Sequence, residues 1–433
     1  MGNEHSTNGT GMKAAFFYDS AALKRDWSFD INSQVLSGTD STVLQVYSYL
    51  REAGHDVTLL ATCHPSPPHP EVPVVANLLE AYDFCLRHAV KFLIYVTNTD
   101  PIQCKLLTHA AEGATGLIAW AHNNPEFAWC NQAWACPAFH RMVAVSNVQR
   151  LSLAAHPIFS RTVAISNFLD DALCAGPGPM TPADANQVTY VGALKLSKGF
   201  HHLAAVWPAV RTRFPQATLN VCGSPGLYQS DIVLGTEGIA EVEFEKTILA
   251  FLGGSRASAE QLGVRFLGSL PKKALYEKIQ ASGFVVVNPN MPKDGSIETF
   301  CVSAAEALAL GIPVVGAATG GLLEVVGHGK GGLLASNGAE LLAAVSTLLA
   351  QPEVARRLAR QGQERVVRLF TKARSMQRWE ALLNGDTLPA ATPTDVRLKD
   401  KSYYFKSMVR LVLPLSFINK VRGARRKASG ISS

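Results

Sequence analysis

Several patterns that would assign this chain to a familiar class are missing from its 433 residues. No run reaches the roughly 18 uninterrupted apolar residues that a membrane-spanning helix needs. None of the eight cysteines forms a C-x-x-C pair, and the twelve histidines show no H-E-x-x-H spacing. We therefore expect reduced thiols in a cytoplasmic protein, with neither a disulfide framework nor a protein-held metal. The N-terminus also lacks a basic segment followed by an apolar one, so we expect no secretory signal.

The chain is poor in charge, but the charge that it has is unevenly placed. Charged residues make up 17% and apolar residues 47%, which excludes global disorder and allows two folded domains. The net charge is +6, yet the last 39 residues hold ten Lys or Arg against two Asp. The preceding part is therefore close to neutral, and its charge does not favour nucleic-acid binding. The basic segment 397–427 also contains aromatic and aliphatic residues, so it suits either peripheral contact with an anionic membrane or a solvated, disordered tail.

Twelve short apolar runs, with helical segments between them, indicate the fold class. The runs are 14–18, 57–61, 92–96, 116–120, 142–145, 163–165, 188–191, 218–222, 264–267, 284–287, 313–315 and 332–334. Continuous apolar character over a few residues is typical of strands that are buried on both faces of a parallel sheet. The alternation predicts a doubly wound α/β architecture. The segment 170–187 is rich in Gly, Pro and Ala and is predicted to link two domains.

The segment 296–326 carries the strongest functional signal. Glu298 lies in a loop after the run 284–287, and Glu306 lies eight positions later in a helix predicted from Val302 or Ser303 to Gly311. Free backbone N–H groups at the start of this helix, around Phe300, Cys301 and Val302, form a site for a diphosphate. One segment thus offers contacts for a sugar (Glu298), a diphosphate and a ribose (Glu306).

This segment resembles the Glu-x7-Glu motif of family 4 glycosyltransferases, which have the GT-B fold. The matching residues are Glu298, Phe300, Glu306, Ala307, Gly311, Pro313, Val314, Val315, Gly320, Gly321 and Glu324. The sequence departs from the family pattern at Thr299 and Cys301, where the family commonly has glycine.

A second segment, 189–203, resembles the family's V-G-R-L-x-x-x-K-G strand and loop. The resemblance implies that Lys198 contacts the diphosphate of the donor as a point charge. The family's arginine falls on Ala193 here, and Lys195 is the nearest substitute cation.

The N-terminal half matches more loosely. Residues 36–62 resemble the family's glycine loop and first helix, where Gly38 allows close approach of the backbone to the donor or the acceptor. His122, in the segment 120–127, corresponds to the histidine that the family places beside the transferred sugar. Asn167 and Asp170 match a family segment that we assign to ordering the linker.

The resemblance implies two Rossmann-like domains that face each other across a cleft. We divide the chain into a disordered leader (1–11), an N-terminal acceptor domain (12–169), a linker (170–187), a C-terminal nucleotide-sugar domain (188–369), a helix that crosses back to the N-terminal domain (370–387) and a basic tail (388–433).

The resemblance also implies a retaining hexosyltransferase. It would move a hexose from a nucleoside-diphosphate sugar, with UDP favoured, to a hydroxyl of a glycan or lipid-linked acceptor in polysaccharide or glycoconjugate synthesis. Glu298 and His122 would act on the sugar, no cofactor or metal would be required, and the enzyme would work in the cytoplasm or at the inner face of the membrane. Two alternatives stay open: a catalytically weakened nucleotide-sugar binding subunit, which Ala193 favours, and another GT-B enzyme such as a nucleotide-sugar epimerase.

Overall fold

A computed structural model describes residues 13–23, 27–31, 34, 36–98, 100–174, 185–224, 232–290 and 297–388. The leader 1–11, most of the linker and the basic segment 397–427 lie outside these residues. Within them, no helix has the length and apolar character needed to cross a bilayer.

The strands of the described chain form two six-stranded parallel sheets, and they lie where the apolar runs predict them. The first sheet contains β1 (Ala14–Tyr18), β2 (Val57–Ala61), β3 (Phe92–Val96), β4 (Gly116–Ala121), β5 (Phe139–Ala144) and β6 (Thr162–Ala164). The second contains β7 (Gln187–Val191), β8 (Thr218–Cys222), β9 (Val264–Gly268), β10 (Phe284–Val287), β11 (Val314–Ala317) and β12 (Gly332–Ala335).

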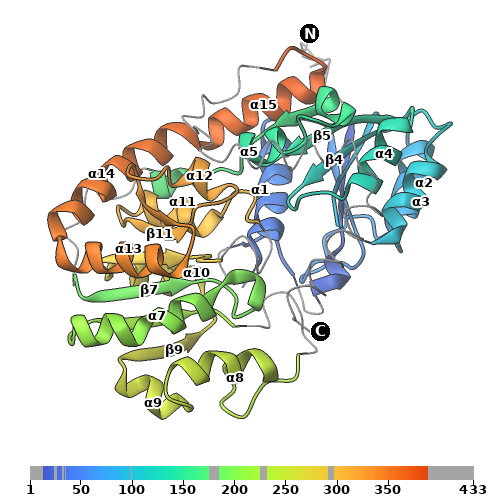
Figure 1. Ribbon diagram of the computed structural model, residues 1–433. Coiled ribbons are helices and arrows are strands. Elements are labelled where there is room, and N and C mark those ends of the chain that lie inside the picture. The colour runs from blue at the N-terminus through green and yellow to red at the C-terminus, as the bar shows by residue number, and fades with distance from the viewer. Residues whose placement is uncertain are drawn as a thin grey trace, which may run out of the picture.

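Helices connect successive strands and cover both sheets (Figure 1). Those of the first half are η1 (Ser20–Leu23), α1 (Gly38–Glu52), α2 (Leu78–Arg87), α3 (Pro101–His109), α4 (Phe127–Ala135), α5 (Asn147–Leu151), η2 (Pro157–Arg161) and α6 (Asp171–Cys174). Those of the second half are η3 (Leu196–Lys198), α7 (Phe200–Arg213), α8 (Val242–Phe251), α9 (Arg256–Gln261), α10 (Lys272–Gln280), α11 (Val302–Ala309), α12 (Leu322–Val325), α13 (Gly338–Ala350), α14 (Pro352–Leu369) and α15 (Lys372–Asn384).

The strand order places a ligand crevice in each half. The first sheet runs β2-β1-β3-β4-β5-β6, and the second runs β12-β11-β10-β7-β8-β9. In each sheet the order reverses beside the first strand, between β1 and β3 and between β7 and β10. Ligands of open parallel sheets bind at the carboxyl ends of the strands that flank such a reversal. The loops that follow β7 and β10 are the ones that contain Lys198 and Glu298.

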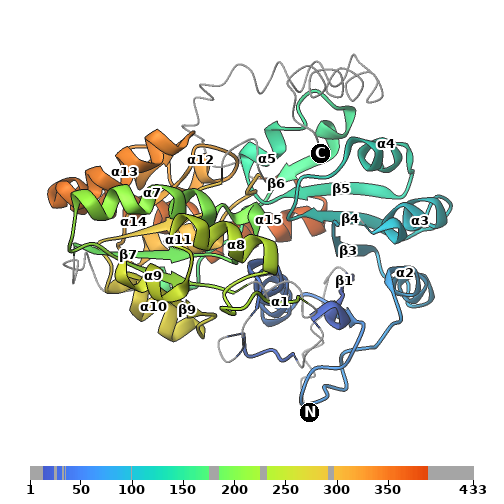
Figure 2. The ribbon, with the colours of Figure 1, turned by 60° about the horizontal axis from the view of Figure 1, so that its bottom comes forward.

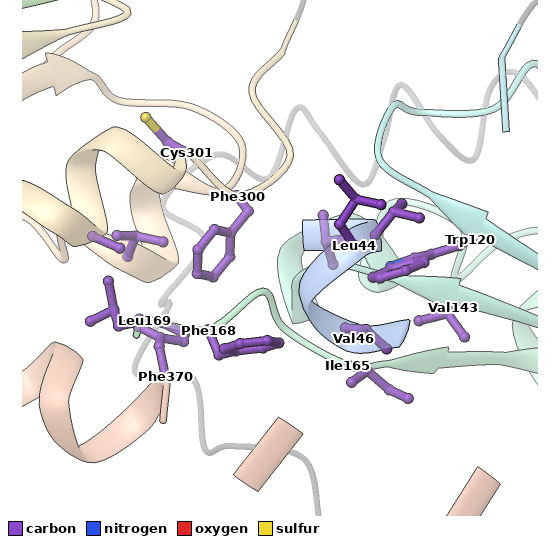
Figure 3. Close-up of a cluster of buried hydrophobic side chains, with 14 of the residues drawn as sticks. Leu44, Val46, Trp120, Val143, Ile165, Phe168, Leu169, Phe300, Cys301 and Phe370 are labelled. Carbon is purple, nitrogen blue, oxygen red and sulfur yellow. The ribbon is translucent and has the colours of Figure 1, made fainter. Parts of the chain in front are cut away.

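The two halves share a continuous apolar core. Figure 3 shows Phe300, Phe370, Phe168 and Leu169 on one side and Trp120 with α1 residues on the other, all in one buried cluster. Separate clusters fill the rest of each half. The helices α14 and α15 follow each other along the molecule, so that α15 lies against the N-terminal half (Figures 1 and 2).

Trp379 of α15 is 1% exposed and packs on Phe16 and Trp120, as the prediction of a packing role for this residue requires.

Candidate functional site

A cavity of about 260 Å³ lies between the two halves and is lined by residues of both. The sequence-predicted residues in its wall are Gly38, His122, Lys198, Glu298, Phe300, Cys301, Val302 and Glu306. From the N-terminal half it takes the start of α1 and the segment 167–170, and from the C-terminal half the loops after β7, β9 and β10. The tertiary structure thus gathers segments that lie up to about 270 positions apart in the chain.

Glu298 is held in this wall by an ion pair and a hydrogen bond. Lys198 Nζ and Asn288 Nδ2 each donate to Glu298 Oε2 at 2.8 Å. The side chains of Lys198 and Glu298 are 22% and 18% exposed, so little water competes for the pair. Burial raises the pKa of the Glu298 carboxyl, but Lys198 and the Asn288 hydrogen bond lower it further, and the net pKa is below its ordinary value. Glu298 is therefore a carboxylate at neutral pH.

The loop after Glu298 reaches α11 through a residue in a left-handed conformation. Cys301 is the N-cap of α11, with φ 76° and ψ 80°. Non-glycine residues rarely adopt this conformation, which explains why glycine is common there in the family that the motif resembles. The turn leaves the first N–H groups of α11 at the cavity, where an anion would be stabilised by the helix dipole.

Glu306, one turn into α11, is oriented by two partners on α10. Tyr276 donates its hydroxyl proton to Glu306 Oε1 at 2.8 Å, and Lys272 Nζ lies 3.2 Å from the same oxygen. All three residues line the cavity. Because both contacts use Oε1, Oε2 is the oxygen best placed to accept hydrogen bonds from a ligand's hydroxyls.

His122 follows β4 and faces the cavity from the opposite half. It is 7% exposed, and its ring lies 4.8 Å from that of Trp120 between centroids. Burial lowers its pKa from 6.5 to about 3, so the ring is neutral. Its Nε2 is buried and has no hydrogen-bond partner among the described residues, which is what a ligand-facing nitrogen would show before the ligand binds.

Gly38 brings the start of α1 against the start of α11. A Cβ atom on Gly38 would lie 3.3 Å from Val302 Cγ2. Ser37 caps α1 by accepting from the backbone N–H of Asp40. Two helix N-termini, from different halves, therefore meet at the same cavity.

The structure does not bring every predicted residue into the cavity wall. Ala193, where the family has arginine, does line the cavity and is 2% exposed. Lys195 lies outside the lining, but close enough to Lys198 that burial and that neighbouring charge lower its pKa. The role of Lys195 as a substitute for the arginine stays a prediction.

Sequence reasoning missed several residues of the site. Asn167 and Asp170 were assigned to the linker, yet both line the cavity, and Asn167 Oδ1 is buried without a partner in the described residues. Asn288 directly follows β10, a position at a strand end that could have identified it. The sequence around Lys272 and Tyr276 contains no motif that predicts a functional role. Both residues reach the site only because α10 packs beside α11.

Comparison with known proteins agrees with this geometry. Residues 179–365 match the family model described as glycosyl transferases group 1. A D-inositol 3-phosphate glycosyltransferase of Corynebacterium urealyticum is 33% identical over 155 residues, or 35% of this chain and 32% of that protein. The match therefore spans about a third of the length of this curated relative.

Solved structures resemble the whole fold at low sequence identity. The sucrose-phosphate synthase of Thermosynechococcus elongatus has a TM-score of 0.61 at 18% identity, covering 86% of this chain and 97% of that one. The Anabaena protein HepE, solved in complex with UDP-glucose, also has a TM-score of 0.61 at 18% identity, covering 86% of this chain and all of that one. These likenesses show the GT-B architecture of two facing Rossmann-like domains. The part of the chain from 179 to 365, somewhat less than half of its length, is thus similar to the glycosyl transferases group 1 family.

Proposed function

We propose that this protein is a retaining glycosyltransferase that moves a hexose from a nucleoside-diphosphate sugar, with UDP favoured, to a hydroxyl of a glycan or lipid-linked acceptor. The observation that carries the proposal is the fixed carboxylate of Glu298. It is paired with Lys198 and Asn288 in the wall of an interdomain cavity, within a domain of glycosyl transferases.

The cavity offers complementary groups for each part of such a donor. The N-terminus of α11 and the Lys198 ammonium suit the diphosphate. Glu306, oriented by Tyr276 and Lys272, suits the ribose hydroxyls. Support for uridine comes from the complex of UDP-glucose with the Anabaena protein of similar fold.

In the proposed reaction the bond between the anomeric carbon and the diphosphate oxygen breaks, and the acceptor oxygen attacks from the same face. The departing phosphate takes the proton of the acceptor hydroxyl. Lys198 and the helix terminus stabilise the negative charge that develops on the diphosphate, so we propose that no metal is required. Glu298 and neutral His122 position the sugar hydroxyls, and Glu298 does not act as a nucleophile.

The second candidate is a binding subunit that holds a nucleotide sugar but turns it over weakly. The observation that favours it is Ala193 in the cavity wall, which leaves Lys198 without the second cation expected in the family. An epimerase with the same fold is the third candidate that the functional test separates. For the glycosyltransferase we also propose that the segment 397–427 contacts an anionic membrane, so that the enzyme acts at the inner face of that membrane.

The proposal is tested by incubating the full-length protein with UDP-, GDP- and ADP-hexoses and a membrane lipid or glycan extract. We expect transfer with retained anomeric configuration from one of these donors. Binding without turnover would support the binding subunit, and isomerisation without transfer would support the epimerase.

We expect Glu298→Ala to lower the rate of transfer by about a hundredfold or more, because the sugar would no longer be held in a reactive orientation. Glu260→Ala is the matched control: it removes a glutamate ion pair with Arg256 that lies outside the cleft. Initial rates with the preferred donor, and circular dichroism to confirm folding, give the comparison. Near-normal transfer by Glu298→Ala would contradict the assignment.

A further inference from the structure

Four hydrogen bonds join the loop after Glu298 and its neighbour α12 to the N-terminal half. Thr299 Oγ1 donates to the carbonyl oxygen of His122 at 2.5 Å. Ser146 Oγ donates to the carbonyl oxygen of Thr299 at 2.6 Å. The Glu324 carboxylate accepts from the Val148 backbone N–H at 3.1 Å and from Asn147 Nδ2 at 3.2 Å. We call these contacts the interdomain clamp.

The first of these contacts joins the two groups that the proposed reaction uses. Thr299 directly follows Glu298 in the chain, and its side chain bonds the backbone of His122 itself. Thr299 and His122 are 7% exposed, so water does not replace this bond easily. The Thr299 hydroxyl is therefore the side-chain contact that directly links the loop of Glu298 to the backbone of His122.

One of the two departures of this segment from the family pattern lies at the same position. The family commonly has glycine where this chain has Thr299, and glycine has no side chain with which to make this contact. The neighbouring backbone allows little adjustment. A Cβ on Gly321 would lie 2.3 Å from the Thr299 carbonyl oxygen, so α12 is packed directly on this peptide. The close packing of α12 thus restricts the conformation of this loop and keeps the Thr299 hydroxyl within hydrogen-bond distance of the His122 carbonyl oxygen.

We propose that Thr299 is a positioning residue that sets His122 against Glu298 across the domain interface. This inference rests on the proposed function. Loss of the hydroxyl leaves the His122 carbonyl buried without this donor and lets the loop of Glu298 shift locally relative to His122, while the other interdomain contacts hold the two halves together. The chemical step suffers, because it needs both groups at once. Binding of the nucleotide does not, because Lys198, Glu306 and the start of α11 all belong to the C-terminal half.

The test compares Thr299→Val with Thr299→Ser. Valine keeps the shape of threonine and removes the hydroxyl, whereas serine keeps the hydroxyl. We expect valine to lower kcat for transfer roughly tenfold or more, with KM for the donor and the calorimetric Kd for UDP within about twofold of wild type. Thr299→Ser, which keeps the hydroxyl, should have a kcat within about threefold of wild type.

Thr115→Val is the matched control. Thr115 is 2% exposed and donates Oγ1 to the Val90 carbonyl oxygen at 2.9 Å, but this bond lies within the N-terminal half and outside the cavity. Thr115→Val should lower the free energy of unfolding about as much as Thr299→Val does, and it should leave kcat unchanged. If Thr299→Val prevents folding, Thr299→Ala is the deciding variant, because it places no methyl group against the His122 carbonyl oxygen.

The inference is overturned if the hydroxyl-free variant keeps the wild-type kcat, if serine fails to rescue it, or if Thr115→Val loses as much kcat. It is also overturned if UDP binding falls in parallel with kcat, since that indicates damage to the donor site. A wild-type protein that transfers no sugar under any condition would instead contradict the proposed function.

Discussion

At the scale of single residues, the two candidate catalytic groups differ in how their charge state is fixed. Glu298 is surrounded by a cation and an amide donor and stays ionised. His122 has no such neighbour for its Nε2 and is neutral because burial opposes its charged form. A neutral ring in the wall of the same cavity as a negatively charged carboxylate can accept or donate a hydrogen bond without adding charge to the site.

The buried neutral His122 makes stability depend on pH. Its pKa is about 3 in the folded protein and 6.5 when exposed. Between these values only the unfolded chain binds the proton, so the free energy of unfolding falls as pH decreases from 6.5 toward 3. It falls by about 1.4 kcal/mol per pH unit for one such group. Above pH 6.5 this contribution is constant.

We therefore expect His122→Asn to weaken the loss of stability between pH 6.5 and 5, measured by urea denaturation at several pH values. His64→Asn, which changes an exposed histidine, should follow the wild-type curve. Parallel curves for His122→Asn and wild type would show that His122 titrates in the folded state.

At the scale of elements, the unit that forms the proposed donor site is β10, its loop and α11, which packs against the turn before α12. Cys301 takes the left-handed turn into α11, and Gly320 and Gly321 lie against the backbone of 298–300. A Cβ on Gly320 would lie 2.1 Å from the Glu298 carbonyl oxygen. This explains why a Gly-Gly pair stands next to the functional loop in this sequence.

Gly320→Ala should both destabilise the protein and impair the site. Gly320 has φ 58° and no space for a Cβ, whereas Gly329 has φ 77° with nothing within 4 Å of a Cβ. Gly329→Ala should therefore cost only the conformational term, about 1–2 kcal/mol. Gly320→Ala should cost roughly 2 kcal/mol more, because the Glu298 backbone must shift.

Urea denaturation measures both variants, and donor turnover shows whether the shift reaches Glu298. Equal stabilities of the two alanine variants would show that the loop adapts to the added methyl group.

At the scale of the whole molecule, the two halves are joined by three kinds of contact. These are the interdomain clamp, the shared apolar core and α15, which packs on α1 in the N-terminal half. The backbone N–H of Leu169 donates to the Phe370 carbonyl oxygen where the chain passes between the halves. These contacts favour unfolding as one cooperative unit.

Trp379→Ala should destabilise the protein by about 3–5 kcal/mol, because it removes a fully buried indole from the contact with Phe16 and Trp120. Trp134→Ala is the control: Trp134 is 38% exposed and should cost less than about 1 kcal/mol. Guanidinium denaturation followed by circular dichroism measures both. A small loss for Trp379→Ala would show that α15 contributes little to the interface.

Much of this architecture is predictable from the sequence. The strands are short, continuous apolar runs because both sheet faces are covered, and that local signal places all twelve of the described strands. Glu298, Glu306 and the start of α11 lie within one segment, and its resemblance to the Glu-x7-Glu motif predicts a nucleotide-sugar site there. The predicted helix start at Val302 agrees with the structure.

Only the tertiary structure decided which residues complete the site. Asn288, Tyr276 and Lys272 contact the two glutamates from other strands and helices, and Thr299 reaches His122 over 177 positions in the chain. Tyr276 and Lys272 leave no local pattern because the packing of α10 beside α11 brings them to Glu306, whereas the packing of the two halves brings Thr299 to His122. The sequence by itself determined the fold and placed Glu298 and Glu306 in one segment, while the packing of the two halves brought Glu298 and His122 into the wall of one cavity.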